Sequence, residues 1–130
     1  MNDELKRFIA EGAAGITPAR LEKLIRLLPR IRLAVTQVHE FPHLADQVEL
    51  LAEIIEDFHS GLSRDIPYTA VAESAFALFY VHKHIDIIPD HIPGMGRADD
   101  AAIVTTVFEN YKQPFLAHVL AQRARKPVEG

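Results

Sequence analysis

The stretch "YTAVAESAFALFYVH", residues 68–82, constrains the fold more than any other part of the chain, because it is the most apolar segment. It is shorter than the roughly twenty apolar residues that a membrane-spanning helix needs, and it contains the acidic residue Glu73. Burial inside a soluble domain satisfies this composition better than insertion into a bilayer. We therefore predict a central apolar helix over residues 66–82, surrounded by the rest of the chain.

The segments before this helix repeat their apolar residues at intervals of three and four, the spacing of a helix with one buried face. The first stripe follows Thr17, a hydroxyl cap, and Pro18, which is favoured in a first turn. Pro29 is expected to break or kink that helix, so that a second, short helix follows. Pro42 opens a longer helix, for which Gly61 is the expected stop.

The segments after the central helix show the same periodicity. Val104 and Val107 lie on one face of the first of them. Pro114 begins a last helix, in which Leu116, Val119 and Leu120 are expected to face inward. The remaining residues, 124–130, form an expected frayed tail. Because no alternating strand pattern occurs, we predict an all-α fold: a single compact helical domain over 1–130, with about six or seven helices.

Composition narrows the functional classes. The chain has 130 residues, which is typical of one domain, and no cysteine, which excludes disulfides, thiolate metal sites and a cysteine nucleophile. The formal net charge of −4 disfavours nucleic acid as a partner. The opening sequence "MNDELKRFIAEG" lacks the apolar run of a signal peptide. We therefore expect a cytoplasmic protein.

Charge is unevenly distributed over the first half of the chain. The basic residues of 1–35 are Lys6, Arg7, Arg20, Lys23, Arg26, Arg30 and Arg32. The acidic residues of 40–57 are Glu40, Asp46, Glu49, Glu53, Glu56 and Asp57. Two neighbouring helices that attract each other explain this pattern, with about 0.2–1 kcal/mol for each exposed pair. One alternative is that one charged face docks a partner of opposite charge. A nucleic-acid site on the basic helices is another, which the lack of interleaved aromatic residues and the nearby acidic residues disfavour.

The stretch "HKHIDIIPDHIPGMGRADD", residues 82–100, concentrates aspartate, histidine, proline and glycine. A structural interpretation makes Asp86 the cap of a short helical turn over 87–91, and places Asp99 and Asp100 in the first turn of the next helix. Asp100, however, falls four residues before Val104, on the buried stripe. A carboxylate that faces inward needs a partner, because an unpaired buried charge costs several kcal/mol.

A ligand or metal site is the alternative interpretation of this stretch. The candidate ligand-binding residues are Asp86, Asp90, Asp99, Asp100 and His91. The candidate metal ligands are Asp86, Asp90, Asp100 and His84, whose oxygen and nitrogen atoms suit a divalent metal. Their spacing matches no strong metal motif, and no nucleophile is paired with a base, so we assign no catalytic residue and expect no cofactor beyond that metal.

Two further polar residues lie in apolar surroundings. Glu73 is expected either at a solvent-facing edge or paired internally with a base from the first helices. His118, like His39, His43 and His59, is expected at the surface or near a helix end.

The segment "ALFYVHKHIDIIPDHIPGMGRADDAAIV", residues 77–104, is similar to the signature of the YkvA-like domain, a family of unknown function. The signature is an apolar helix, then Ile-Asp-hydrophobic-Ile-Pro-Asp, Ile-Pro, a glycine and an Asp-Asp pair that opens another helix. The matching positions are Ile85, Asp86, Ile88, Pro89, Asp90, Ile92, Pro93, Gly96, Asp99 and Asp100. The resemblance implies a YkvA-like core over 66–112 and implies that its four aspartates act as a set, while residues 1–61 match no family.

The chain departs from the family pattern where Lys83 and His84 replace a usual Ser-Pro pair and where His91 replaces a frequent aromatic residue. Many family members resemble membrane-associated proteins. Here Glu73 and the polar residues 82–84 interrupt the apolar run, which disfavours membrane contact.

These observations support three functional hypotheses. The leading one is a non-enzymatic module for protein interaction or homodimerisation, based on the segregated charge. The second is a metal-binding or small-ligand-binding protein, a hydrolase included, that uses the aspartate set. The third is a peripheral membrane protein that uses the apolar loop of residues 85–95.

Overall fold

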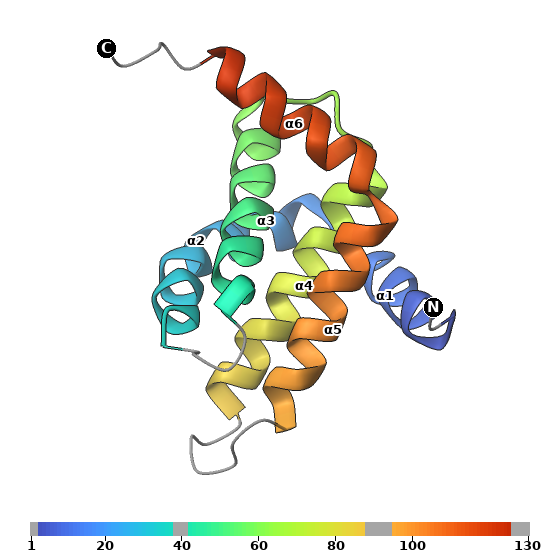
Figure 1. Ribbon diagram of the computed structural model, residues 1–130, viewed down its shortest axis with the longest axis vertical. Coiled ribbons are helices and arrows are strands. Elements are labelled where there is room, and N and C mark those ends of the chain that lie inside the picture. The colour runs from blue at the N-terminus through green and yellow to red at the C-terminus, as the bar shows by residue number, and fades with distance from the viewer. Residues whose placement is uncertain (1–2, 38–41, 88–94, 126–130) are drawn as a thin grey trace.

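The computed structural model describes the backbone of residues 3–37, 42–87 and 95–125, and within these ranges the side chains other than those of 42, 84–87, 95–100 and 125. The described residues form six α-helices and no strand (Figure 1). The helices are α1 (Asp3–Ala13), α2 (Pro18–Val35), α3 (Pro42–Ser60), α4 (Tyr68–Ile87), α5 (Met95–Asn110) and α6 (Lys112–Arg125). The prediction of a compact all-α domain is confirmed.

Helix α4 is the centre of the molecule, as the apolar composition of its sequence requires. It contacts α1, α2, α3 and α5, and Figure 1 shows it running beside α5 through the middle of the bundle. All residues from 70 to 75 are buried, so this part of α4 has no polar outer face. The helix begins two residues later than the predicted range of 66–82 and ends five residues beyond it.

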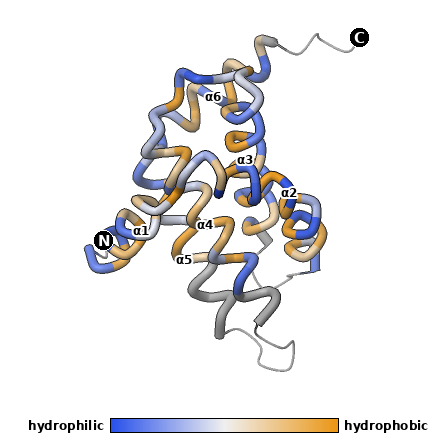
Figure 2. The backbone as a smooth tube through the Cα atoms, turned by 180° about the vertical axis from the view of Figure 1, so that it is seen from behind, coloured by the Kyte–Doolittle hydropathy of each residue, from blue (hydrophilic) through white to orange (hydrophobic). Residues whose placement is uncertain are grey.

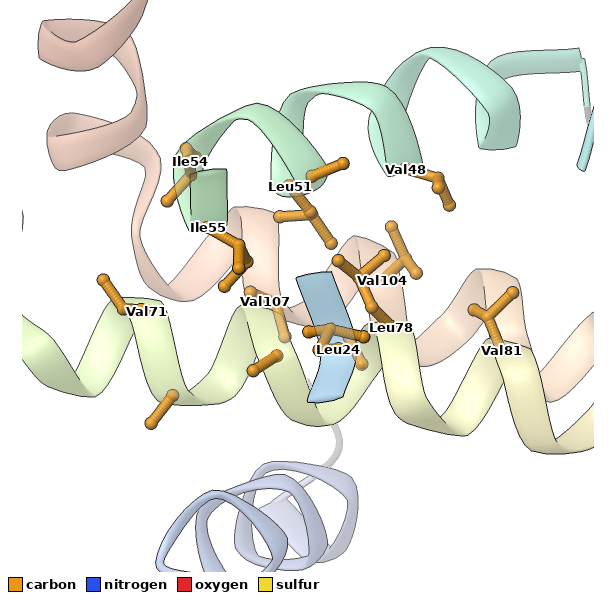
Figure 3. Packing of buried hydrophobic residues seen from close by; sticks show 14 of the residues in the cluster. Leu24, Val48, Leu51, Ile54, Ile55, Val71, Leu78, Val81, Val104 and Val107 are labelled. Atoms are coloured by element: carbon orange, nitrogen blue, oxygen red, sulfur yellow. The ribbon is translucent and has the colours of Figure 1, made fainter. Parts of the chain in front are cut away.

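The main core lies where α3, α4 and α5 meet, with α2 packing against them. Figure 3 shows Leu51 and Ile55 of α3 directed toward Leu78 of α4 and Val107 of α5. All four side chains are fully buried, and each removes apolar surface from water. Within the described ranges, no helix combines the length and the apolar character needed to cross a membrane.

Helix α2 confirms one predicted boundary and corrects another. The Thr17 hydroxyl caps the helix by accepting a hydrogen bond from the Arg20 backbone N–H at 3.2 Å. Pro29, however, lies inside a continuous helix, so the predicted break and the separate short helix after it are wrong. Leu28 and Ile31 are both fully buried beside the proline, and their packing holds the helix together where the proline N–H is missing.

The boundaries of α3 agree with the turn residues of the sequence. The helix starts at Pro42 and ends at Ser60. Gly61 follows with a φ of 84°, a left-handed conformation that glycine adopts without steric cost.

Helix α4 extends further along the chain than the sequence predicts. Asp86 lies in the last turn of α4, which continues to Ile87, while most of the predicted turn over 87–91 lies outside the described residues. Helix α5 begins at Met95, which places Asp99 and Asp100 beyond its first turn. The expected first-turn role of these two aspartates is therefore wrong.

Candidate functional site

The predicted aspartate site lies outside the residues whose side chains are described. This holds for every member of the two predicted sets: Asp86, Asp90, Asp99, Asp100, His84 and His91. Their assignment as ligand-binding or metal-binding residues stays a prediction. Among the described residues, no group of three or more histidines, aspartates and glutamates is arranged to hold a metal ion.

The segregated charge of the first half brings α2 and α3 together through Arg32. Its guanidinium donates to both carboxylate oxygens of Glu49, at 2.8 and 3.1 Å, and to both of Glu56, at 2.8 and 2.9 Å. The bonds to Glu56 raise the pKa of Arg32, against the opposing effect of burial. Attraction between neighbouring helices therefore accounts for this basic residue, and Lys23, Arg26 and Arg30 remain exposed.

The contact with Arg32 also changes the pKa of Glu49. Burial alone would raise the pKa of Glu49, but hydrogen bonds with Arg32 and Glu53, together with the charge of Arg32, hold it below its usual value. The ion pair thus favours the charged carboxylate in the folded protein.

Glu73 is buried in α4, with 9% of its surface exposed, and its partners among the described residues are neutral. Its Oε2 accepts a hydrogen bond from the Tyr111 hydroxyl at 2.8 Å, and its Oε1 accepts one from the Asn110 side-chain amide at 3.2 Å. Of the two sequence-based alternatives, internal pairing is correct, but the expected base is not the partner. The donors come from the end of α5 and the residue after it.

Tyr111 experiences the negative charge of Glu73. Burial raises the pKa of the Tyr111 hydroxyl, and the hydrogen bond to Glu73 and its charge raise it further, while a hydrogen bond with Thr69 acts in the opposite direction. The phenol is therefore held in its neutral form, in which it can donate to the carboxylate.

Glu73 also lines a pocket of about 300 Å³ between α1 and α4. Four alanines supply much of the wall, and Ile16, Tyr68 and Thr69 complete it. The Tyr68 hydroxyl donates to the Ile16 carbonyl oxygen at 3.0 Å, which ties the start of α4 to the turn after α1. The short alanine side chains leave this space open between two helices that are otherwise packed together.

His118 joins α6 to α3, although its sequence position suggested a surface residue. The imidazole is buried, and its Nε2 lies 3.2 Å from Oδ2 of Asp57. One turn further on, the Gln122 side-chain amide donates to Glu53 at 2.9 Å. These contacts fasten α6 across the end of the bundle where α3 ends and α4 begins (Figure 1).

Helix α6 turns an apolar face to solvent, which the sequence did not predict. Leu116 is 53% exposed and Leu120 is 55% exposed, whereas Phe115 and His118 are the residues that face inward. Figure 2 shows hydrophobic and hydrophilic residues interleaved along this helix. The prediction that Leu116 and Leu120 point inward is therefore wrong.

A groove of about 340 Å³ lies beside this exposed face, between α3, α5 and α6. Its apolar lining residues are Leu50, Phe108, Phe115, Leu116 and Val119. Glu109 and Lys112, which carry opposite charges, also border it. The spacing of Leu116, Val119 and Leu120 revealed an apolar stripe, but periodicity does not say which chain covers it.

Comparison with protein-family models gives a match to the central part of the chain. The family model described as "Protein of unknown function (DUF1232)" matches residues 70–106, which comprise most of α4, most of α5 and the segment between them. This range contains all of residues 77–104, so the predicted resemblance to YkvA-like proteins is confirmed over that segment. No curated protein and no solved structure matches the chain.

Proposed function

We propose that this chain, whose residues 70–106 match the DUF1232 family model, is a non-enzymatic interaction module that forms a homodimer through α6. One observation carries the proposal: Leu116 and Leu120 stand about half exposed beside an open apolar groove. Contiguous apolar surface of this kind is typical of protein interfaces.

A second copy of the chain suits this surface because the exposed leucines and the apolar groove lie on the same face of the molecule. In a two-fold dimer the same patch meets itself, so each copy must supply both complementary parts. Leu120 of one copy would enter the groove of the other, and the reverse contact would follow by symmetry. Glu109 and Lys112 also have opposite charges, so each can pair with the other across the axis.

The free energy of dimerisation can be approximated from the apolar side chains that the interface would bury. Full burial of a leucine side chain contributes about 1.5–3 kcal/mol, so four half-exposed leucines, two from each copy, contribute about 3–6 kcal/mol. Association itself costs about 4–15 kcal/mol, which the leucines alone do not offset. With the groove aromatics added, we expect a reversible dimer whose population rises with protein concentration.

Sedimentation equilibrium over a range of protein concentrations tests the proposal. The wild-type chain should shift from monomer to dimer, and the double variant Leu116→Ser, Leu120→Ser should remain monomeric. Leu33→Ser is the matched control, because Leu33 is an exposed leucine on α2, 68% exposed and away from the groove. A wild-type chain that stays monomeric throughout, or a control that dissociates equally, would contradict the proposal.

A charge exchange tests the orientation of the two copies. Glu109→Lys alone should weaken the dimer by placing like charges together, and Glu109→Lys with Lys112→Glu should restore it. If the double exchange dimerises no better than the single variant, the two-fold arrangement is wrong.

We also propose a cytoplasmic location. The absence of cysteine among 130 residues supports a reducing compartment, in which disulfides are rare. Fractionation of cells that express the tagged chain would test this, and recovery with membranes or in an extracellular fraction would contradict it.

A further inference from the structure

We infer that the pocket between α1 and α4 is a binding site for a small primary ammonium ligand, with the carboxylate of Glu73 as its anionic partner. This site is separate from the α6 surface and does not depend on dimerisation.

The charge of Glu73 is the first part of the argument. The side chain is about nine-tenths buried, yet its two hydrogen-bond donors among the described residues, Tyr111 and Asn110, are uncharged. Among the described residues, no lysine, arginine or histidine forms an ion pair with it. A buried charge without a counter-charge costs several kcal/mol, so the site favours a cation.

The acceptor capacity of the carboxylate is the second part. Two carboxylate oxygens offer about four acceptor positions, and the two donors from the described part of the chain occupy two of them. An ammonium group that enters the pocket can donate to the remaining positions. The two existing bonds meanwhile hold the carboxylate in place, so it is oriented before a ligand arrives.

The pocket walls select the kind of cation. Divalent metals require several oxygen ligands, whereas Glu73 is the only acidic residue among those that line this pocket. The alanine side chains suit a short alkyl chain, the Thr69 hydroxyl can accept a hydrogen bond, and the Tyr68 ring offers an aromatic surface to a cation. A volume of about 300 Å³ is at the lower end for small-molecule sites, which fits a short aliphatic amine.

Isothermal titration calorimetry with n-butylammonium chloride tests this site. The wild-type chain should bind n-butylammonium saturably and should bind neither n-butanol nor sodium butyrate, which share the chain but lack the positive charge. Glu73→Gln should weaken binding at least about tenfold, as expected for loss of a charge-assisted contact.

A second variant keeps the test decisive if Glu73→Gln does not fold. Ala10 is an exposed residue of α1 that lines the pocket, so Ala10→Leu should fill the entrance and weaken binding without altering Glu73. Ala102→Leu is the control, because Ala102 is also an exposed helical alanine and lies on α5 outside the pocket. The inference is overturned if the wild type shows no saturable binding, if butyrate binds equally well, or if folded Glu73→Gln or Ala10→Leu protein binds like the wild type.

Discussion

Gly12 of α1 lies against the Phe76 ring of α4, and the structure predicts the cost of adding one methyl group there. A Cβ atom built on Gly12 would lie 2.6 Å from Cζ of Phe76 and still closer to Cε1 and Cδ1 of the same ring. Carbon atoms make optimal contact at about 3.5–4.0 Å, so the ring must move as a whole. Phe76 is not free to do so, because it packs against Phe8 at 5.4 Å and Tyr80 at 6.2 Å between ring centroids.

Two opposing terms determine the magnitude for Gly12→Ala. Overpacking of a well-filled contact costs about 1–3 kcal/mol, whereas alanine is better than glycine inside a helix by about 0.5–1 kcal/mol. The net expectation is a loss of about 1–2 kcal/mol in the free energy of unfolding. For a domain of this size, that corresponds to a melting temperature lower by roughly 3–8 °C.

Urea denaturation followed by circular dichroism measures this loss, and Gly15→Ala supplies the control. A Cβ atom at Gly15 would meet only the Gly12 carbonyl oxygen at 3.7 Å, an ordinary contact, and Gly15 does not have a positive φ. Gly15→Ala should therefore leave stability unchanged or raise it by up to about 1 kcal/mol. Adding Phe76→Leu to both backgrounds should show a coupling of about 1 kcal/mol, because the smaller side chain relieves the contact. If Gly12→Ala is as stable as Gly15→Ala, the close approach of α1 and α4 is refuted.

Three further predictions concern the polar contacts. Arg32→Met should lower stability by about 0.5–2 kcal/mol, after allowance for solvent screening of the two half-exposed carboxylates, and urea denaturation in 1 M salt should show a smaller loss. Folding lowers the pKa of Glu49, so the stability that its charged form contributes is complete above the unfolded carboxyl pKa of about 4.3 and is lost as the pH falls further. In thermal melts from pH 6 to 3, the melting temperature of Arg32→Met should therefore fall less than that of the wild type. Tyr111→Phe should lower the free energy of unfolding by about 1–3 kcal/mol, because Glu73 loses one hydrogen-bond donor. Folding also raises the pKa of Tyr111, so in alkaline melts the wild type should lose stability above about pH 10 more steeply than this variant.

The helices could be predicted well from local signals. Thr17 before Pro18, Pro42 and Gly61 act through the backbone of their own turn, so the sequence alone identifies them as boundaries. Pro29 was predicted to break the helix because a proline removes a hydrogen bond from its own turn. The packing that compensates for this loss involves other helices, which are distant in sequence. The burial of Leu28 and Ile31 against other helices outweighs the missing hydrogen bond, and periodicity carries no measure of that packing energy.

Polar pairs were harder to predict than helices because their partners are distant in sequence. Glu73 was correctly singled out as a residue that requires an explanation, but its donors Asn110 and Tyr111 lie almost forty positions later. His118 similarly meets Asp57 across the bundle. A sequence pattern can show that a buried carboxylate or imidazole needs a partner, but only the packing of helices decides which one it finds.

Helix α6 shows what sequence periodicity cannot predict about function. An apolar stripe at three- and four-residue spacing states that a surface avoids water, and it says nothing about which molecule covers that surface. For Leu51 in α3 the cover is the chain's own core, whereas for Leu116 and Leu120 it is not. Phe115 and the contact of His118 with Asp57 already fix the inward face of α6, so the leucines cannot turn inward without breaking both. The exposed stripe is therefore a consequence of how α6 is anchored, and the homodimer proposed above is one arrangement that would remove it from water.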